Sequence, residues 1–136
     1  MGLPRAAPEY CILDPHVHVW VNDPHYPWAK ETTDPPHHDA TPAMLLELMK
    51  ANGVARTVLV QYIGYRWDNR YTLDSMKKHQ PYFMGVCRVN PADPAAPDQL
   101  SQLTEQGFHG VRLSPAADAS GDWIRGVSDA APMEAR

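Results

Sequence analysis

The sequence predicts an α/β fold in which parallel strands alternate with helices. Four short runs of β-branched or apolar residues have the length of strands, namely residues 10–14, 57–61, 83–89 and 109–114. Helical stretches lie between these runs, and the last three runs recur about every 26 residues. Strands joined in this way by right-handed crossover helices lie parallel in one sheet.

The helix expected at residues 41–53 has recognisable signals at both ends. Thr41 suits the N-cap, and Pro42 suits the first helical position. Gly53 can take the left-handed conformation that ends many helices. The helix should bury one apolar face on the sheet, formed by Met44, Leu45, Leu48 and Met49.

Two further helices are expected at residues 68–80 and 97–107, each with a short apolar stripe. The proline-rich segment 20–40 follows the first strand, which is where a functional loop of a βα unit lies. Because the strand pattern fades after the fourth run, we expect one domain over residues 1–126 and a divergent tail at 127–136.

Composition and cysteine usage favour a cytoplasmic protein. The 136 residues carry a formal net charge of −4, which argues against nucleic acid as a partner. No apolar run approaches the roughly 18–20 residues that span a bilayer, and the first ten residues lack an apolar leader. Cys11 and Cys87 fall in predicted strands, so we expect both thiols to be buried in a reducing compartment.

The stretch ILDPHVHVW at residues 12–20 ends the first apolar run with an acidic residue and two histidines. Side chains two residues apart in a strand share a face, so Asp14, His16 and His18 should point the same way. Two imidazoles at a strand end suit a divalent metal, and Asp14 could orient them. The alternative is a chance spacing, since the chain contains seven histidines.

Several motifs together resemble the amidohydrolase superfamily, and more narrowly its fuconolactonase-like branch. The resemblance covers most of residues 10–126 and rests on LDPHVHVW (13–20), HYPW (25–28), the run at 40–61, CRVNP (87–91) and GFHGVRLSP (107–115). It implies the N-terminal half, about four βα units, of a TIM-type (β/α)₈ barrel.

The resemblance also implies a chemistry. His16 and His18 would be the first two ligands of a catalytic metal, commonly zinc. Similar enzymes act on a small-molecule substrate and use a metal-activated water to attack its lactone, ester or amide carbonyl. Other members of the superfamily decarboxylate their substrates, and some lactonases of this branch work without a metal.

Three polar residues at predicted strand ends are candidates for substrate binding. Gln61 closes the second strand and Arg88 lies near the end of the third. Arg112 shares a face with Ser114 near the end of the fourth strand, where its guanidinium could hold a carboxylate or a lactone oxygen. The alternative for each is a structural ion pair or carbonyl contact inside the fold.

The chain also departs from the family pattern. A barrel of this kind takes about 250 residues, and the later family ligands, two histidines and an aspartate, have no counterpart here. We therefore expect a truncated half-barrel with an incomplete active site, in which zinc is weakly bound or absent. Its open sheet edges predict self-association. The alternatives are an inactive half-barrel remnant and a small βα binding domain.

Overall fold

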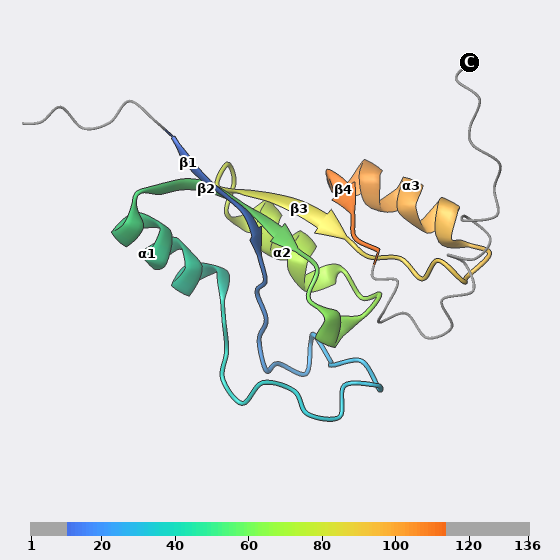
Figure 1. Ribbon diagram of the computed structural model, residues 1–136. Helices are drawn as coiled ribbons and strands as arrows, with labels where there is room; N and C mark the ends of the chain where they lie inside the picture. Colours follow the sequence, from blue (N-terminus) through green and yellow to red (C-terminus); the bar gives the residue numbers. More distant parts are fainter. Residues whose placement is uncertain (1–10, 114–136) are drawn as a thin grey trace, which may run out of the picture.

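The computed structural model describes residues 11–113, which form one four-stranded parallel sheet of order β1-β2-β3-β4 (Figure 1). The strands are β1 (Ile12–Val17), β2 (Val54–Val60), β3 (Phe83–Cys87) and β4 (Gly110–Val111). The helices are α1 (Pro42–Asn52), α2 (Arg70–Lys78) and α3 (Ala96–Gln106), with a short 3₁₀ turn, η1 (Ile63–Tyr65). The predicted parallel βα order is confirmed, while the domain limit expected after residue 126 lies outside the described residues.

Helix α1 begins and ends where the sequence predicts. The Thr41 hydroxyl accepts a hydrogen bond from the backbone N–H of Met44 at 3.3 Å, and Gly53 ends the helix at a φ of 68°. The predicted apolar face is only half right, because Met44 and Leu48 are 53% and 62% exposed. They lie on one flank of the helix, whereas Leu46 on the other flank packs against the core.

All three helices pack against one face of the sheet. The buried core joins side chains of the helices to side chains of the strands and their flanks, namely Val19, Met49, Leu59, Met76, Phe83, Cys87 and Phe108. Helix α2 lies close to β3 because Gly85 has no side chain, and a Cβ there would overlap the sulfur of Met76. This arrangement follows from right-handed crossovers between neighbouring parallel strands.

The other face of the sheet is uncovered by the described residues. Leu13 and Met84 point into this face and are 60% and 44% exposed. With Val58 they line an apolar hollow of about 530 Å³. Cys11 also lines this hollow and is exposed, so the prediction that it is buried was wrong, whereas Cys87 is fully buried as predicted.

Strand β1 contains a bulge that the sequence did not predict. Asp14 pairs with Thr57 and Val17 pairs with Leu59, so β1 has one extra residue over this interval. The strand also ends later than predicted, at Val17 instead of residue 14. By contrast β4 is shorter than the predicted 109–114, and Ser114 lies outside the described residues.

The proline-rich segment after β1 is an ordered loop at the carboxyl ends of the strands (Figure 1). Its base is closed by two backbone hydrogen bonds between Trp20 and Ala40, at 2.9 and 3.0 Å. Inside the loop, Trp28 stacks on Tyr65 with ring centroids 4.6 Å apart, and the Tyr65 hydroxyl hydrogen-bonds both the N–H and the C=O of Val21. Among residues 11–113, no helix is long and apolar enough to cross a membrane.

Candidate active site

The two histidines of β1 share one face of the sheet at its carboxyl end, as predicted. Val17 lies between them and pairs with the buried core residue Leu59, so the imidazoles of His16 and His18 point to the opposite, uncovered face. Their ring centroids are 4.9 Å apart and the rings are nearly perpendicular, at 89°.

The prediction that Asp14 shares the face of the two imidazoles was wrong. The extra residue of the bulge puts Asp14 on the same face as Val17, because both pair with β2 residues that point toward the helices. The Asp14 carboxylate instead accepts a hydrogen bond from the backbone N–H of His16 at 3.1 Å. Asp14 therefore fixes the backbone of the bulge and does not orient either ring.

His18 is held in one tautomer. Its Nδ1 lies 2.7 Å from the carbonyl oxygen of Val60, which can only accept, so Nδ1 carries the proton and Nε2 carries the lone pair. Burial lowers the pKa of His18 below its usual 6.5, and the positive charges of Arg112 and Arg88 act in the same direction. His18 is therefore a neutral base at physiological pH, with Nε2 as its acceptor atom.

Arg112 reaches His16 from the far end of the sheet. Its Nη1 lies 3.1 Å from His16 Nε2, although β1 and β4 are separated by two strands. A guanidinium only donates, so His16 Nε2 is the acceptor in this contact. The sheet is therefore curved enough for side chains at its two ends to meet above its uncovered face.

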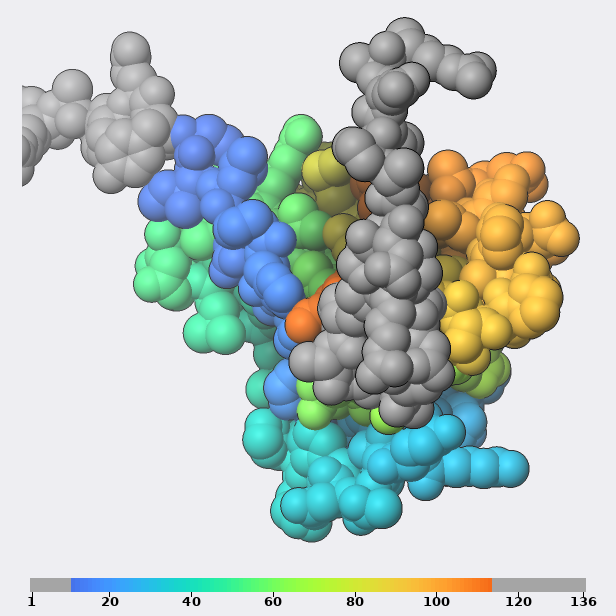
Figure 2. All heavy atoms as spheres, turned by 45° about the vertical axis from the view of Figure 1, so that its right-hand side comes forward, coloured from blue at the N-terminus to red at the C-terminus, as the bar shows by residue number. Residues whose placement is uncertain are grey.

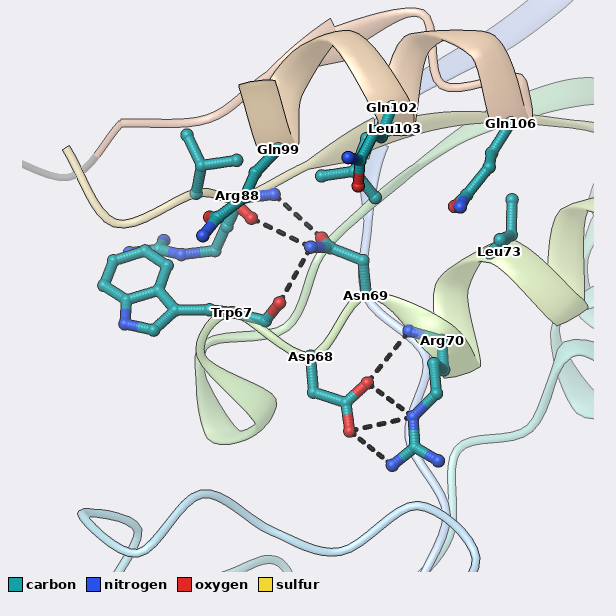
Figure 3. Close-up of a pocket in the computed structure, with 11 residues that line it drawn as sticks. Trp67, Asp68, Asn69, Arg70, Leu73, Arg88, Gln99, Gln102, Leu103 and Gln106 are labelled. Carbon is teal, nitrogen blue, oxygen red and sulfur yellow. Dashed lines mark hydrogen bonds and ion pairs between the residues drawn. The ribbon is translucent and has the colours of Figure 1, made fainter. Parts of the chain in front are cut away.

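Arg88 lies at the end of β3 and is buried. Its guanidinium carbon is 5.4 Å from the centre of the Trp67 ring, a cation–π contact. Asn69 holds the backbone on both sides: it accepts from the Arg88 N–H and donates to the Arg88 carbonyl, each at 2.8 Å (Figure 3). The N-cap residue of α2 thus fixes the position of Arg88 instead of capping its own helix.

Gln61 does not join the other candidates. Its side chain points toward the helices, where Oε1 accepts from the Thr72 hydroxyl and Nε2 donates to the Asp68 carbonyl at 2.7 Å. Both polar atoms of its amide are thus hydrogen-bonded inside the fold. Of the five predicted site residues, His16, His18 and Arg112 come together, Arg88 contributes charge beside them, and Gln61 lies on the opposite face.

Tyr62 belongs to the site, although it is not among the site residues predicted from the sequence. Its ring centroid is 5.7 Å from that of His18, and it stacks on Trp20 at 4.9 Å with an angle of 29°. Tyr62 follows Val60 by two residues, so the alternation of β2 carried beyond the strand would have placed it on the histidine face. These two aromatic rings form an apolar wall next to the imidazole pair.

The fit of these residues to a divalent metal is partial. His18 offers a correctly protonated imidazole with its Nε2 lone pair directed away from the Val60 contact. His16 uses its Nε2 lone pair to accept from Arg112, so it could bind a metal through this atom only after Arg112 moves. Within residues 11–113 no group of three or more His, Cys, Asp or Glu side chains could hold a metal.

Comparison with known proteins identifies relatives of the chain. The amidohydrolase family model matches residues 13–131. The chain is 31% identical over 115 residues to the L-fucono-1,5-lactonase of Burkholderia ambifaria, which covers 82% of this chain and 39% of that enzyme. It is 34% identical over 102 residues to a 2-pyrone-4,6-dicarboxylate hydrolase of Comamonas testosteroni, covering 75% of this chain and 32% of that enzyme.

Solved structures agree on the architecture. An Acinetobacter baumannii protein described as a probable 2-pyrone-4,6-dicarboxylic acid hydrolase, crystallised with citric acid, superposes with a TM-score of 0.67 at 21% identity, covering 85% of this chain and 44% of that protein. A Pseudomonas putida protein assigned the same activity has a TM-score of 0.61 at 28% identity, covering 76% and 36%. The chain thus spans less than half the length of these relatives and has the fold of half an amidohydrolase barrel. It belongs to the amidohydrolase family.

Proposed function

We propose that this chain supplies the N-terminal half of the active site of a hydrolase that opens lactones by attack of water on the ring carbonyl. The observation that carries the proposal is the meeting of His16, His18 and Arg112 at the carboxyl ends of β1 and β4. In barrels built of βα units, chemistry takes place at this end. The two relatives above are named for the hydrolysis of a fuconolactone and a pyrone dicarboxylate. A third relative, 31% identical over 101 residues (74% of this chain and 32% of that enzyme), is the 4-sulfomuconolactone hydrolase of Hydrogenophaga intermedia. All three names favour hydrolysis over decarboxylation.

Arginine chemistry favours an anionic lactone as the substrate. Among residues 11–113, the Arg112 guanidinium donates to His16, and the other donors of its planar fork would bind the acid group of a ligand. Arg88 adds positive charge close enough to lower the pKa of His18. Two of the relatives carry an acid group in the names of their substrates, a dicarboxylate and a sulfo group. Tyr62 and Trp20 would hold the flat, apolar part of the lactone ring against His18.

The proposal includes a divalent metal, most simply zinc. Members of this family usually hold one, and it would polarise the lactone carbonyl and supply an activated water. His16 and His18 would be the ligands from this chain, and further ligands would come from outside the described residues. The role of the chain's own residues is to hold Nε2 of His18 as an acceptor and to bind the acid group of the substrate.

A chimera tests the proposed function. Residues 11–113 would replace the matching part of the Burkholderia ambifaria lactonase, and ring opening would be measured on a neutral fuconolactone and on a pyrone dicarboxylate. We expect Arg112→Ala to lower kcat/KM on the dicarboxylate by roughly 100-fold and to change the neutral substrate far less. Arg56→Ala is the control, because Arg56 lies at the opposite end of the sheet. A folded chimera that opens neither lactone would contradict the proposal.

Metal analysis tests the incomplete site separately. A two-imidazole site should bind zinc weakly, because structural and catalytic zinc sites use three or four protein ligands. We expect the purified 136-residue chain to lose its zinc on dialysis, and the chimera to keep it. One tightly held zinc per 136-residue chain would show that the site is complete without the other half.

A further inference from the structure

We propose that Arg112 controls the binding of a divalent metal at the histidine pair, so that a metal and an acidic ligand bind this site cooperatively. Nη1 of Arg112 lies 3.1 Å from Nε2 of His16. In Figure 2 the orange-red end of the described segment lies next to the blue residues of β1. The inference rests on the proposed function, which supplies both the metal and the acid group of the ligand.

Arg112 and a metal compete for one lone pair on His16. A guanidinium only donates, so Nε2 of His16 is the acceptor in the contact with Arg112. An imidazole that accepts at Nε2 carries its proton on Nδ1, and a metal binds only an unprotonated nitrogen. Nδ1 of His18 lies 2.7 Å from the Val60 carbonyl oxygen, so His18 offers Nε2 alone. While Arg112 stays in place, the pair therefore offers a metal one lone pair instead of two.

Positive charge at the pair also opposes a metal. Besides burial, the charges of Arg112 and Arg88 lower the pKa of His18, so both guanidinium groups are close enough to disfavour a positive charge on this ring. A divalent cation bound at Nε2 of His18 would meet the same repulsion. The Asp14 carboxylate does not offset this repulsion from the same side, because Asp14 lies on the opposite face of the sheet. An anion bound to either arginine should therefore strengthen metal binding.

The side chain of Arg112 can leave His16 without disturbing the sheet. The backbone N–H of Arg112 donates to the Cys87 carbonyl at 2.8 Å, which holds the chain just after β4 against β3. The contact between Arg112 and His16 is exposed to solvent, so water can replace each partner when the contact breaks. Opening the contact therefore requires a change of side-chain rotamer alone.

An acidic ligand would draw Arg112 away from His16. A carboxylate or sulfonate accepts two parallel N–H bonds from a guanidinium and carries a negative charge, so it is a stronger partner than one imidazole nitrogen. The move frees the lone pair of His16 and offsets a positive charge, and both effects favour the metal. By linkage, the metal raises the affinity for the acid by the same factor. A neutral lactone leaves Arg112 on His16, so the site selects acidic substrates through metal binding.

A zinc titration of the full chain with isotope-labelled histidine, followed by nuclear magnetic resonance, tests this coupling. The ring nitrogens of His16 and His18 report zinc at this site and separate it from zinc bound at other histidines. Benzenesulfonate is the acid probe, because a sulfonate has little affinity of its own for zinc, and methyl phenyl sulfone is its neutral counterpart. We expect saturating benzenesulfonate to lower the dissociation constant for zinc at the pair by about 10-fold. The sulfone should leave it unchanged.

Arg112→Leu tests the role of the arginine itself. Without the guanidinium, zinc should bind the pair about 10-fold more tightly than in the wild type, and benzenesulfonate should have no further effect. Arg56→Leu is the matched control, because it removes the same charge at the opposite end of the sheet. A variant that only disturbed the fold would weaken zinc binding instead of strengthening it.

Two results would overturn the proposal. One is the same zinc affinity of the wild-type chain with benzenesulfonate and with the sulfone, and the other is a folded Arg112→Leu chain that binds zinc no more tightly than the wild type. The wild-type comparison decides the matter alone if the variant fails to fold by circular dichroism. The lactonase chimera can open its substrates with or without this coupling, so the two proposals fail separately.

Discussion

Asn69 offers the sharpest test of how the fold positions the site. Its side chain is buried and makes three hydrogen bonds: it accepts from the Arg88 N–H at 2.8 Å, and donates to the carbonyls of Arg88 at 2.8 Å and Trp67 at 3.0 Å. Asn69→Ala removes all three. At about 1 kcal/mol for each neutral hydrogen bond, the free energy of unfolding should fall by roughly 3 kcal/mol.

Urea unfolding followed by circular dichroism measures this loss. With an m-value of about 1.5 kcal/mol/M for a domain of this size, the midpoint should fall by roughly 2 M. Protein concentration must be the same for both chains, because any association changes apparent stability. The control is Asn52→Ala, whose exposed amide donates only to Leu48 and should change stability by less than about 0.5 kcal/mol. A loss as small as the control's would refute the view that Asn69 fixes the end of β3.

Four further predictions follow from the burial and packing of particular residues. Tyr65→Phe should lower stability by about 2 kcal/mol in thermal or urea melts, because both polar groups of Val21 lose their partner. Burial raises the pKa of Tyr65 to about 12, above the value of 10 in the unfolded chain. The stabilisation from the neutral Tyr65 hydroxyl is therefore complete below pH 10 and should be lost as the pH rises from 10 to 12. In an absorbance titration, one tyrosine should ionise at higher pH than the exposed ones, and its absence would contradict this prediction. Iodoacetamide should modify Cys11 well before Cys87, whose thiol pKa is raised by burial, and equal rates by mass spectrometry would be the opposite result. Gly85→Ala should destabilise by roughly 1–3 kcal/mol through overlap with Met76, and an unchanged melting temperature would show that this methionine moves aside freely.

The sequence predicted the parts of the fold that depend on local chemistry. The start and end of α1 follow from Thr41 and Gly53, whose conformations need few tertiary contacts. The order of strands and helices followed from residue spacing, and the shared face of His16 and His18 followed from the alternation of a strand.

The features that the sequence could not predict depend on contacts between residues that are distant along the chain. The bulge in β1 reverses Asp14 relative to the histidines, and an extra residue in one strand is visible only against its neighbour. Gln61 continues the alternation of the buried Thr57 and Leu59, and its position on the helix side is set by which face of the sheet the helices cover. The contact between Arg112 and His16 requires the curvature of the whole sheet.

The hydrogen bonds that close the base of the proline-rich loop keep the two histidines in place when the loop itself changes. Because Trp20 and Ala40 are hydrogen-bonded to each other, the ends of segment 21–39 stay together whatever its length. Insertions and deletions there would change the rim of the site without displacing β1 or α1. Substrate range could therefore be altered by changing this segment alone, in evolution or by exchange in the laboratory, provided that the hydrogen bonds between Val21 and Tyr65 are kept.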